Sequence, residues 1–210
     1  MTMMGPMLRH VIFATLVAAT AFCAPSAAAQ DSPDTIVKRV AEDTLAAVRS
    51  DPQIQAGNQA RIREVVEVKV APYFDFTRIT ALAMGKNWRV ATPEQQKRLT
   101  EEFRSLLVRT YSGALGQYRD EKIDYKPVRM NAGDTDVIVR TAVVRSSGPP
   151  VPVDYSMQKT ADGWKCYDVI VGGVSLVTNY RDEFNAQVEK GGVDGLIKAL
   201  ADRNKGGAAK

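Results

Sequence analysis

Two carboxylates on neighbouring predicted strands are the residues best placed for acid–base chemistry. Asp168 lies within the apolar run 164–171, and Asp154 lies on the strand that precedes this run. A carboxyl group that loses water in such surroundings has a raised pKa and could act as a general acid, with Tyr155 or Tyr167 as a hydrogen-bond donor. Asp168 also suits a structural acceptor or a cap near the turn that follows. We favour this structural role, because perturbed carboxylates are often structural.

Other chemically versatile residue types are scarce. His10 is the only histidine and lies in a segment that we expect to be cleaved. Its loss excludes Ser-His-Asp and Cys-His catalysis and an ordinary zinc site. Cys166 would then be the only cysteine, and its apolar strand indicates a small buried side chain rather than a nucleophile. Asp134 and Asp136 form an Asp-x-Asp pair beside Gly133, which we interpret as turn residues. No glycine spacing matches a phosphate-binding loop.

The first 29 residues have the three parts of a secretory signal peptide. Arg9 precedes an apolar run over residues 11–22, and small residues lead to a predicted cleavage after Ala29. The apolar run is too short to span a membrane. Cys23 could indicate a lipid anchor, but the bulky Phe22 before it argues against one. We therefore expect a mature chain of 181 residues in the periplasm, without an anchor.

The mature chain has the size of a single domain with a sizeable core. We expect this domain over residues 30–204, followed by a disordered tail over 205–210. Arg9 is the only charged residue before the cleavage point, so the mature chain carries 27 basic and 24 acidic residues. No run of like charges suggests a nucleic-acid surface. The mild excess of basic residues could favour an anionic membrane or an acidic partner, but a mixed solvated surface explains it equally well.

Apolar residues spaced three and four apart predict four helices, over residues 35–49, 58–70, 75–84 and 92–117. The last of these has the strongest local signal. Thr92 to Gln95 forms a capping box with proline at the first helical position. A helix over 92–117 would be about 39 Å long at about 1.5 Å per residue, long enough to cross the domain.

The period then changes to alternation, which predicts strands over about 123–130, 135–146, 151–160 and 163–171. Short turn-like links imply an antiparallel meander. Gly172 and Gly173 let the chain turn sharply into a helix that folds back onto apolar surface, and a last helix near 193–201 follows two further glycines. The predicted fold is therefore α+β: a four-stranded twisted antiparallel sheet with helices packed on one face, enclosing an apolar pocket.

Motifs in both halves of the chain carry a family resemblance. They are Val70 to Phe76, Met84 to Arg89, Thr92 to Gln95, Tyr167 to Val171, Gly173 to Val177, Asn179 to Arg181 and Gly192 to Ile197. Together they resemble the MlaC family of periplasmic phospholipid-binding proteins, also called the toluene-tolerance auxiliary family. The similarity spans about residues 35–201. Gly172 stands where an acidic residue is common in that family, which removes a charge from the rim of the pocket.

The resemblance implies a soluble carrier that moves phospholipid between the outer and inner membranes and maintains outer-membrane lipid asymmetry. It implies two partners: an inner-membrane lipid-transport ABC complex with an MCE-domain subunit, and an outer-membrane lipoprotein–porin complex. It implies no catalysis, and no cofactor beyond the bound phospholipid. We expect the carrier to be a monomer that does not bind nucleic acid. Each methylene removed from water is worth about 0.8 kcal/mol, so an acyl chain needs an enclosed apolar cleft.

We predict that this cleft lies between the long helix and the sheet. The long helix would face the sheet across the cleft, the start of the following helix would close the mouth, and the short helix and its neighbour would line the side. The predicted lipid-binding residues are Phe103, Leu106, Leu107 and Tyr111 on the long helix, Val139, Val143, Tyr155, Met157, Val169 and Val171 on the sheet, Val174, Leu176 and Tyr180 at the mouth, and Ile79, Leu82 and Trp88 along the side.

Two other classes of protein fit the same residues. One is a small acid/base enzyme that uses Asp168 and Asp154 on a cone-like α+β fold. The other is a periplasmic chaperone or adaptor that binds apolar peptide in the same cleft. Identification of the extracted cargo separates all three classes.

Overall fold

The structure is a computed structural model that describes residues 31–115, 121–145 and 148–206. The predicted signal peptide lies outside the described residues. In chain order the elements are α1 (Pro33–Ser50), α2 (Pro52–Gln55), α3 (Gln59–Lys69), η1 (Ala71–Tyr73), α4 (Phe76–Met84), η2 (Gly85–Arg89), α5 (Pro93–Leu115), β1 (Lys122–Tyr125), β2 (Asp136–Val144), β3 (Val151–Thr160), β4 (Gly163–Val171), β5 (Val174–Ser175) and α6 (Leu176–Gly206).

The strands form an antiparallel meander, as the short links predicted. Within the described residues the sheet has five strands in the order β1-β2-β3-β4-β5, one more than the four predicted. The additional strand, β5, is two residues long and pairs Val174 with Val171 and Ser175 with Ile170. A strand this short has no alternation to reveal it. It forms because Gly172 and Gly173 adopt φ values of 58° and 86°, which suit a two-residue hairpin turn.

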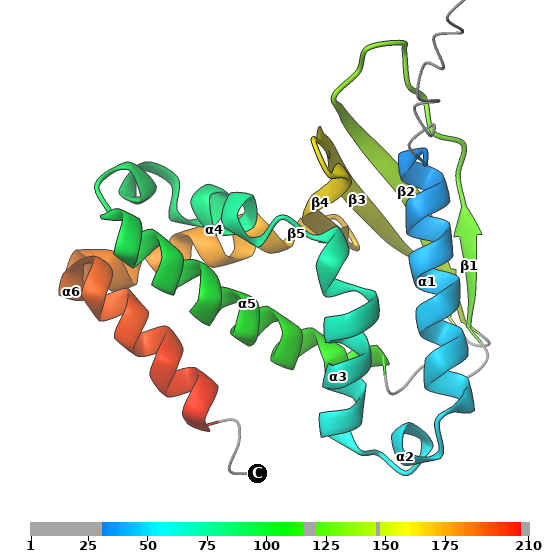
Figure 1. Cartoon of the computed structure of the whole chain (residues 1–210), viewed down its shortest axis with the longest axis horizontal. Coiled ribbons are helices and arrows are strands. Elements are labelled where there is room, and N and C mark those ends of the chain that lie inside the picture. Colours follow the sequence, from blue (N-terminus) through cyan, green and yellow to red (C-terminus); the bar gives the residue numbers. More distant parts are fainter. Residues whose placement is uncertain (1–30, 116–120, 146–147, 207–210) are drawn as a thin grey trace, which may run out of the picture.

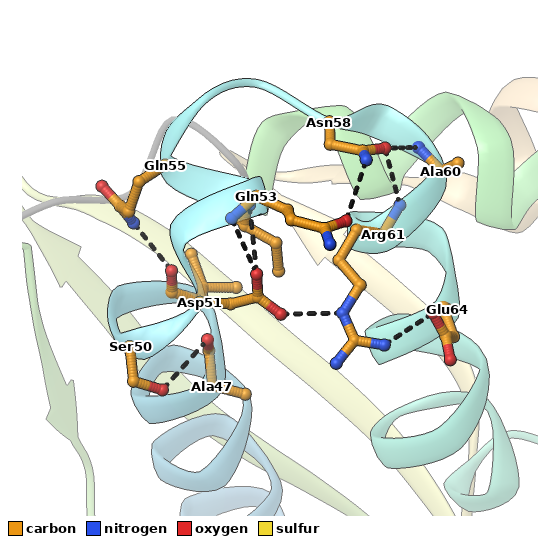
Figure 2. A network of polar contacts seen from close by, with 11 residues as sticks. Ala47, Ser50, Asp51, Gln53, Gln55, Asn58, Ala60, Arg61 and Glu64 are labelled. Atoms are coloured by element: carbon orange, nitrogen blue, oxygen red, sulfur yellow. Dashed lines mark hydrogen bonds and ion pairs between the residues drawn. The ribbon is translucent and has the colours of Figure 1, made fainter.

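A network of polar contacts joins α1, α2 and α3 (Figure 2). Asp51 ends α1 and caps α2, where its Oδ1 accepts a hydrogen bond of 2.9 Å from the backbone N–H of Gln53. Its Oδ2 accepts one of 2.7 Å from Nε of Arg61 on α3. Asn58 caps α3 by accepting from the backbone N–H groups of Ala60 and Arg61, both at 3.1 Å. The sequence showed the break at Pro52, but α2, at four residues, is too short to show a period.

Reciprocal hydrogen bonds begin α5, as the capping box predicted. The Thr92 N–H donates to Oε1 of Gln95 at 2.9 Å, and the Gln95 N–H donates to Oγ1 of Thr92 at 3.2 Å. The last helix, α6, contains a break at Gly192, whose φ of 66° and ψ of −171° are not helical. The predicted boundary between two C-terminal helices is therefore correct. Lys205 and Gly206 still belong to α6.

Buried side chains form three clusters. One cluster joins α4, α5 and α6, where the ring of Phe103 makes edge contacts with Tyr180 at 4.9 Å and Phe184 at 4.8 Å between centroids. A second joins α1 to the sheet, and a third joins α1, α2 and α3. Figure 1 shows α4, α5 and α6 on one side of the molecule and the sheet with α1 on the other. The space between these two parts contains the candidate site.

Candidate functional site

An apolar cavity of about 250 Å³ lies between the helices and the sheet. We call it the α5 cavity. Its wall comes from α3, η1, α4, α5, β3, β4 and the start of α6. Its lining includes Leu107 and Val108 of α5 and Val169 and Val171 of β4. Long apolar stripes on a helix and a sheet therefore meet here without filling the space between them, whereas the same helix is packed tightly at Phe103.

The only charged residue in the described wall of the α5 cavity is Asp168, and its carboxylate is already hydrogen-bonded. Ser175 Oγ donates to its Oδ2 at 2.6 Å, and the backbone N–H of Val177 donates to its Oδ1 at 3.2 Å. The N–H of Thr178 in turn donates to Ser175 Oγ at 3.1 Å. Asp168 thus fixes the first turn of α6 against β4, which is the structural role that we favoured from the sequence.

The α5 cavity opens between α5 and the end of β4. In the described part of its wall the exposed side chains are Tyr111, 39% exposed, and Val171, 42% exposed. Partial burial, together with the neighbouring Tyr180 phenol, raises the pKa of the Tyr111 phenol to about 12. Next to this entrance Val174, on the β4–β5 turn, is 60% exposed. The entrance therefore has an apolar rim and a neutral phenol.

A second apolar cavity, of about 160 Å³, lies between α1 and the sheet. We call it the α1 cavity. It is lined by α1 residues including Val37 and Ala41, and by sheet residues including Val143 and Met157. Its wall contains no charged side chain among the described residues. The hydroxyl of Thr44, which also lines it, donates to the carbonyl of Val40 at 2.6 Å, so this polar group is satisfied.

A wider surface hollow of about 990 Å³ lies at the opposite end of α1 from its start, and its wall contains both apolar and charged residues. Its wall includes the charged residues Glu42, Arg49 and Lys122. Arg49 donates from Nη2 to the carbonyl of Glu121 at 3.0 Å. A depression lined by charged groups does not suit an apolar ligand, so we place the candidate site at the two apolar cavities.

The two carboxylates considered as a catalytic pair differ in their surroundings. In the register of β3 and β4, Asp154 lies opposite Ile170 and Asp168 opposite Ser156, so the two are diagonal neighbours on one face of the sheet. Asp154 lines neither apolar cavity, and its partner position on β2 is Arg140. Asp168 lines the α5 cavity, with its carboxylate bonded to Ser175 and Val177.

The remaining chemically versatile residues also have structural environments. Oδ2 of Asp134 accepts from the Asn131 N–H at 2.7 Å, which confirms the predicted turn at Asp134, whereas Asp136 is the first residue of β2 and not a turn residue. Asp136 accepts from Nη2 of Arg78 at 3.2 Å, and the guanidinium of Arg78 lies 3.7 Å from the centre of the Tyr167 ring. No group of three potential metal ligands occurs in the described residues. The two contacts of Arg78 attach α4 to the sheet.

Cys166 is buried, as predicted, and is not poised for nucleophilic chemistry. Its thiol donates to the carbonyl of Asp168 at 3.2 Å, and burial raises its pKa to about 12. The thiol is therefore protonated at neutral pH.

The structure divides the predicted lipid-binding residues among different environments. Those that line the α5 cavity are Ile79, Leu107, Tyr111, Tyr155, Val169, Val171 and Leu176. Those that line the α1 cavity are Val143, Met157 and again Tyr155. Five others pack within or against the cluster of α4, α5 and α6, namely Leu82, Trp88, Phe103, Leu106 and Tyr180. Val139 is buried between α1 and the sheet, and Val174 is exposed on the turn. Lipid contact by any of these residues stays a prediction.

Sequence reasoning missed much of the wall on the N-terminal side. The α5 cavity is also lined by Val66, Val70, Phe74 and Phe76, and the α1 cavity by the apolar stripe of α1. Phe74 precedes the cap of α4 in a stretch with no helical or strand period, so periodicity could not place it. Phe76 was predicted on the apolar side of the short helix, but the sequence did not show that it faces a cavity. The α1 stripe was recognised as apolar, but sequence alone did not show that a cavity lies beneath it.

Two apolar cavities in an α+β domain define the class: a domain with internal space suited to an apolar ligand. Comparison with known proteins gives the family. The model of the family described as MlaC protein matches residues 38–202, and this chain belongs to that family.

Individual relatives agree with this assignment. The chain is 27% identical to the toluene tolerance protein ttg2D of Pseudomonas putida, over 85% of this chain and 83% of the relative. It is 22% identical to the intermembrane phospholipid transport system binding protein MlaC of Haemophilus influenzae, over 92% and 89% of the two chains. A solved phospholipid-binding protein from Ralstonia solanacearum, in complex with a phospholipid, is 41% identical and superimposes with a TM-score of 0.79, covering 85% of this chain and 99% of that one.

Within the described residues no helix is both long and apolar enough to cross a membrane.

Proposed function

We propose that this protein is a periplasmic phospholipid carrier that holds acyl chains in its apolar cavities and moves lipid between membranes. The observation that carries the proposal is the α5 cavity, an apolar space of about 250 Å³ with an apolar entrance and a single, already hydrogen-bonded carboxylate. Membership of the MlaC family supports it, as does the likeness to a protein solved in complex with a phospholipid.

The energetics of this site suit a carrier. An acyl chain costs about 0.8 kcal/mol of free energy per methylene exposed to water, so most of the affinity comes from enclosure of the chain. A cavity without free polar groups has little means of selecting a particular head group. We therefore expect diacyl phospholipid as the cargo, with little preference among head groups.

The wider role follows the family. In this proposal the signal peptide is removed after Ala29 and the protein works in the periplasm as a monomer without a lipid anchor. It exchanges lipid with an inner-membrane ABC complex that has an MCE-domain subunit and with an outer-membrane lipoprotein–porin complex, which maintains outer-membrane lipid asymmetry. It performs no catalysis, and bound phospholipid is cargo rather than a cofactor.

The test is identification of the cargo. Protein purified from the periplasm without detergent should carry phospholipid in native mass spectrometry, and organic extraction should recover diacyl species. Its intact mass should match a chain that starts at Gln30. Protein that carries no phospholipid and takes none from vesicles would contradict the proposal. Bound peptide would instead indicate a chaperone or adaptor.

A further inference from the structure

The first strand of the sheet has one edge that no described strand covers. β1 pairs with β2 on one side, and the strand order places β1 at the end of the sheet. Figure 1 shows it there, beside α1. At the opposite end of the sheet β5 pairs with the end of β4, and Phe74 forms a bridge with Cys166 of β4. β1 therefore has the longer uncovered edge in the described sheet, and such an edge can pair with another chain.

The ladder between β1 and β2 shows which backbone groups point outward. The N–H of Lys126 donates to the carbonyl of Arg140 at 3.0 Å, and these two residues lie opposite each other in the register of the two strands. Hydrogen-bonded pairs alternate with non-bonded pairs in an antiparallel ladder. The N–H and carbonyl groups of Ile123 and Tyr125 therefore point away from β2. No hydrogen bond to these groups occurs among the described residues.

Two features limit this uncovered edge to a short segment. At one end the carbonyl of Glu121 accepts a hydrogen bond of 3.0 Å from Nη2 of Arg49, near the end of α1. At the other end Pro127 has no N–H to donate. We call the outward side of the strand between these two limits, which presents the backbone of Ile123 and Tyr125, the β1 edge.

The β1 edge borders the surface hollow of about 990 Å³. Ile123 and Tyr125 line this hollow together with Leu45, which is buried, and with charged residues. The phenol oxygen of Tyr125 is buried and has no hydrogen-bond partner among the described residues, and the exposed Glu42 lines the hollow beside it. A bound chain that displaced Glu42 would supply the missing partner. An uncovered strand edge beside a hollow with apolar residues is an arrangement by which sheets bind an extended peptide.

The charges on β1 argue against a second copy of this chain at the β1 edge. An antiparallel pair of β1 strands that used the outward groups of both copies would centre on Asp124. Asp124 would then lie opposite the same residue of the other copy, and Lys122 would lie opposite Lys126. Like charges directly opposite each other destabilise a pair of strands. The same positions favour a strand of another protein, with acidic residues opposite the two lysines.

We propose that the β1 edge binds a short extended segment of a partner protein, which adds to the sheet as an antiparallel strand. The backbone of the segment bonds to the outward groups of Ile123 and Tyr125. Its apolar side chains enter the hollow, and its acidic side chains lie opposite Lys122 and Lys126. The inference goes beyond the proposed function, because it concerns a protein partner and requires no lipid.

A capped synthetic peptide of sequence TEVTVET tests the site. In either direction its central part places valines opposite Ile123 and Tyr125 and glutamates opposite the two lysines. In isotope-labelled protein, saturating peptide should slow the amide hydrogen exchange of Ile123 and Tyr125 at least about tenfold, as measured by NMR. Exchange at Asp124 should change much less, because its N–H already faces β2. Absence of protection, or equal protection at all three residues, would overturn the proposal.

Charge substitutions test the register. The reversed peptide TKVTVKT should bind at least about tenfold more weakly than TEVTVET, and Lys122→Glu should weaken the binding of TEVTVET at least about threefold, because each change turns an attraction across the strands into a repulsion. The matched control is Lys159→Glu, which is exposed on β3 at the other end of the sheet and should bind TEVTVET like the unsubstituted protein. Equal affinity of the two variants would overturn the proposal.

The remaining alternative is a second copy of the chain. Ile123 and Tyr125 would then become protected without peptide as the protein concentration rises, and sedimentation would show a dimer. That result would overturn the proposal. We expect no such dependence on concentration, because the like charges on β1 oppose pairing of the two copies.

Discussion

Ser175 donates a hydrogen bond of 2.6 Å to Asp168, and this contact joins the last long strand of the sheet to the first turn of α6. The same carboxylate accepts the N–H of Val177 at 3.2 Å. The residue that looked most like an acid–base group in the sequence therefore holds together the corner beside the cavity entrance.

Removal of this carboxylate should destabilise the fold. Asp168→Ala leaves the N–H of Val177 and the Ser175 hydroxyl without their acceptor, which costs about 1–3 kcal/mol for buried groups. Ser175→Ala should cost about 1 kcal/mol as a lost helix cap, and the double variant should cost less than the sum because the two residues share one contact. Urea unfolding measures the stability of all three variants.

The control is Glu189→Ala, on the exposed side of α6, which should change stability by no more than about 0.5 kcal/mol. Equal stability of Asp168→Ala and the control would contradict this role.

Charges placed in the α5 cavity should remove lipid but not the fold. Leu107→Glu and Val169→Glu put a carboxylate into a space that can hold water. Both variants should therefore stay folded, show a cooperative thermal transition, and carry at least about tenfold less phospholipid after purification. Lys97→Glu, on the exposed face of α5, should change neither property.

The same substitution in the packed cluster should act differently. Phe103 is 1% exposed and contacts two other rings, so Phe103→Glu should unfold the domain. If Leu107→Glu and Val169→Glu also unfolded, those residues would be core rather than cavity wall. If they folded and kept normal lipid, the cargo would lie elsewhere.

The contact between Asp51 and Arg61 in Figure 2 should make the free energy of unfolding depend on pH under acidic conditions. Arg61, followed by the backbone N–H groups of Gln53 and Ile54, holds the pKa of Asp51 below its ordinary value of 3.8. A carboxyl group whose pKa is lowered by folding stabilises the native state above its unfolded pKa and loses that contribution as pH falls through the folded value. Asp51→Asn should therefore flatten the acid limb of a plot of urea midpoint against pH. Arg61→Gln should flatten it too, and should add little in the Asp51→Asn background. An unchanged acid limb in Asp51→Asn would refute the coupling.

The β4–β5 turn should require glycine. Gly173 has a φ of 86°, where a side chain is strained whatever the space around it, so Gly173→Ala should cost roughly 1–2 kcal/mol. The matched control is Gly195→Ala in the second segment of α6, where an added Cβ meets no atom within 4 Å. It should stabilise the protein by up to about 1 kcal/mol, because alanine favours a helix over glycine. Thermal unfolding measures the stability of both variants. If Gly173→Ala left the stability unchanged, the turn would tolerate another backbone geometry.

Sequence periodicity predicted the elements better than it predicted their contacts. The capping box at Thr92 and the alternation after Ile123 were correct because both are local properties of the chain. Phe103 and Leu107 lie one turn apart on the same stripe of α5, so the sequence treated them alike. The structure places Phe103 against aromatic rings and Leu107 at a cavity. Which of the two a residue meets depends on elements far along the chain, α6 for Phe103 and β4 for Leu107, and no local pattern encodes that.

The two cavities also determine how the protein responds to hydrostatic pressure. Unfolding eliminates internal space that side chains do not fill, so it lowers the volume of the system and pressure promotes it. An acyl chain that occupies the α5 and α1 cavities removes this difference in volume. Lipid-loaded protein should therefore withstand a higher pressure than the same protein after delipidation, and the gain should exceed that expected from binding affinity alone, because the cargo acts as part of the packed interior.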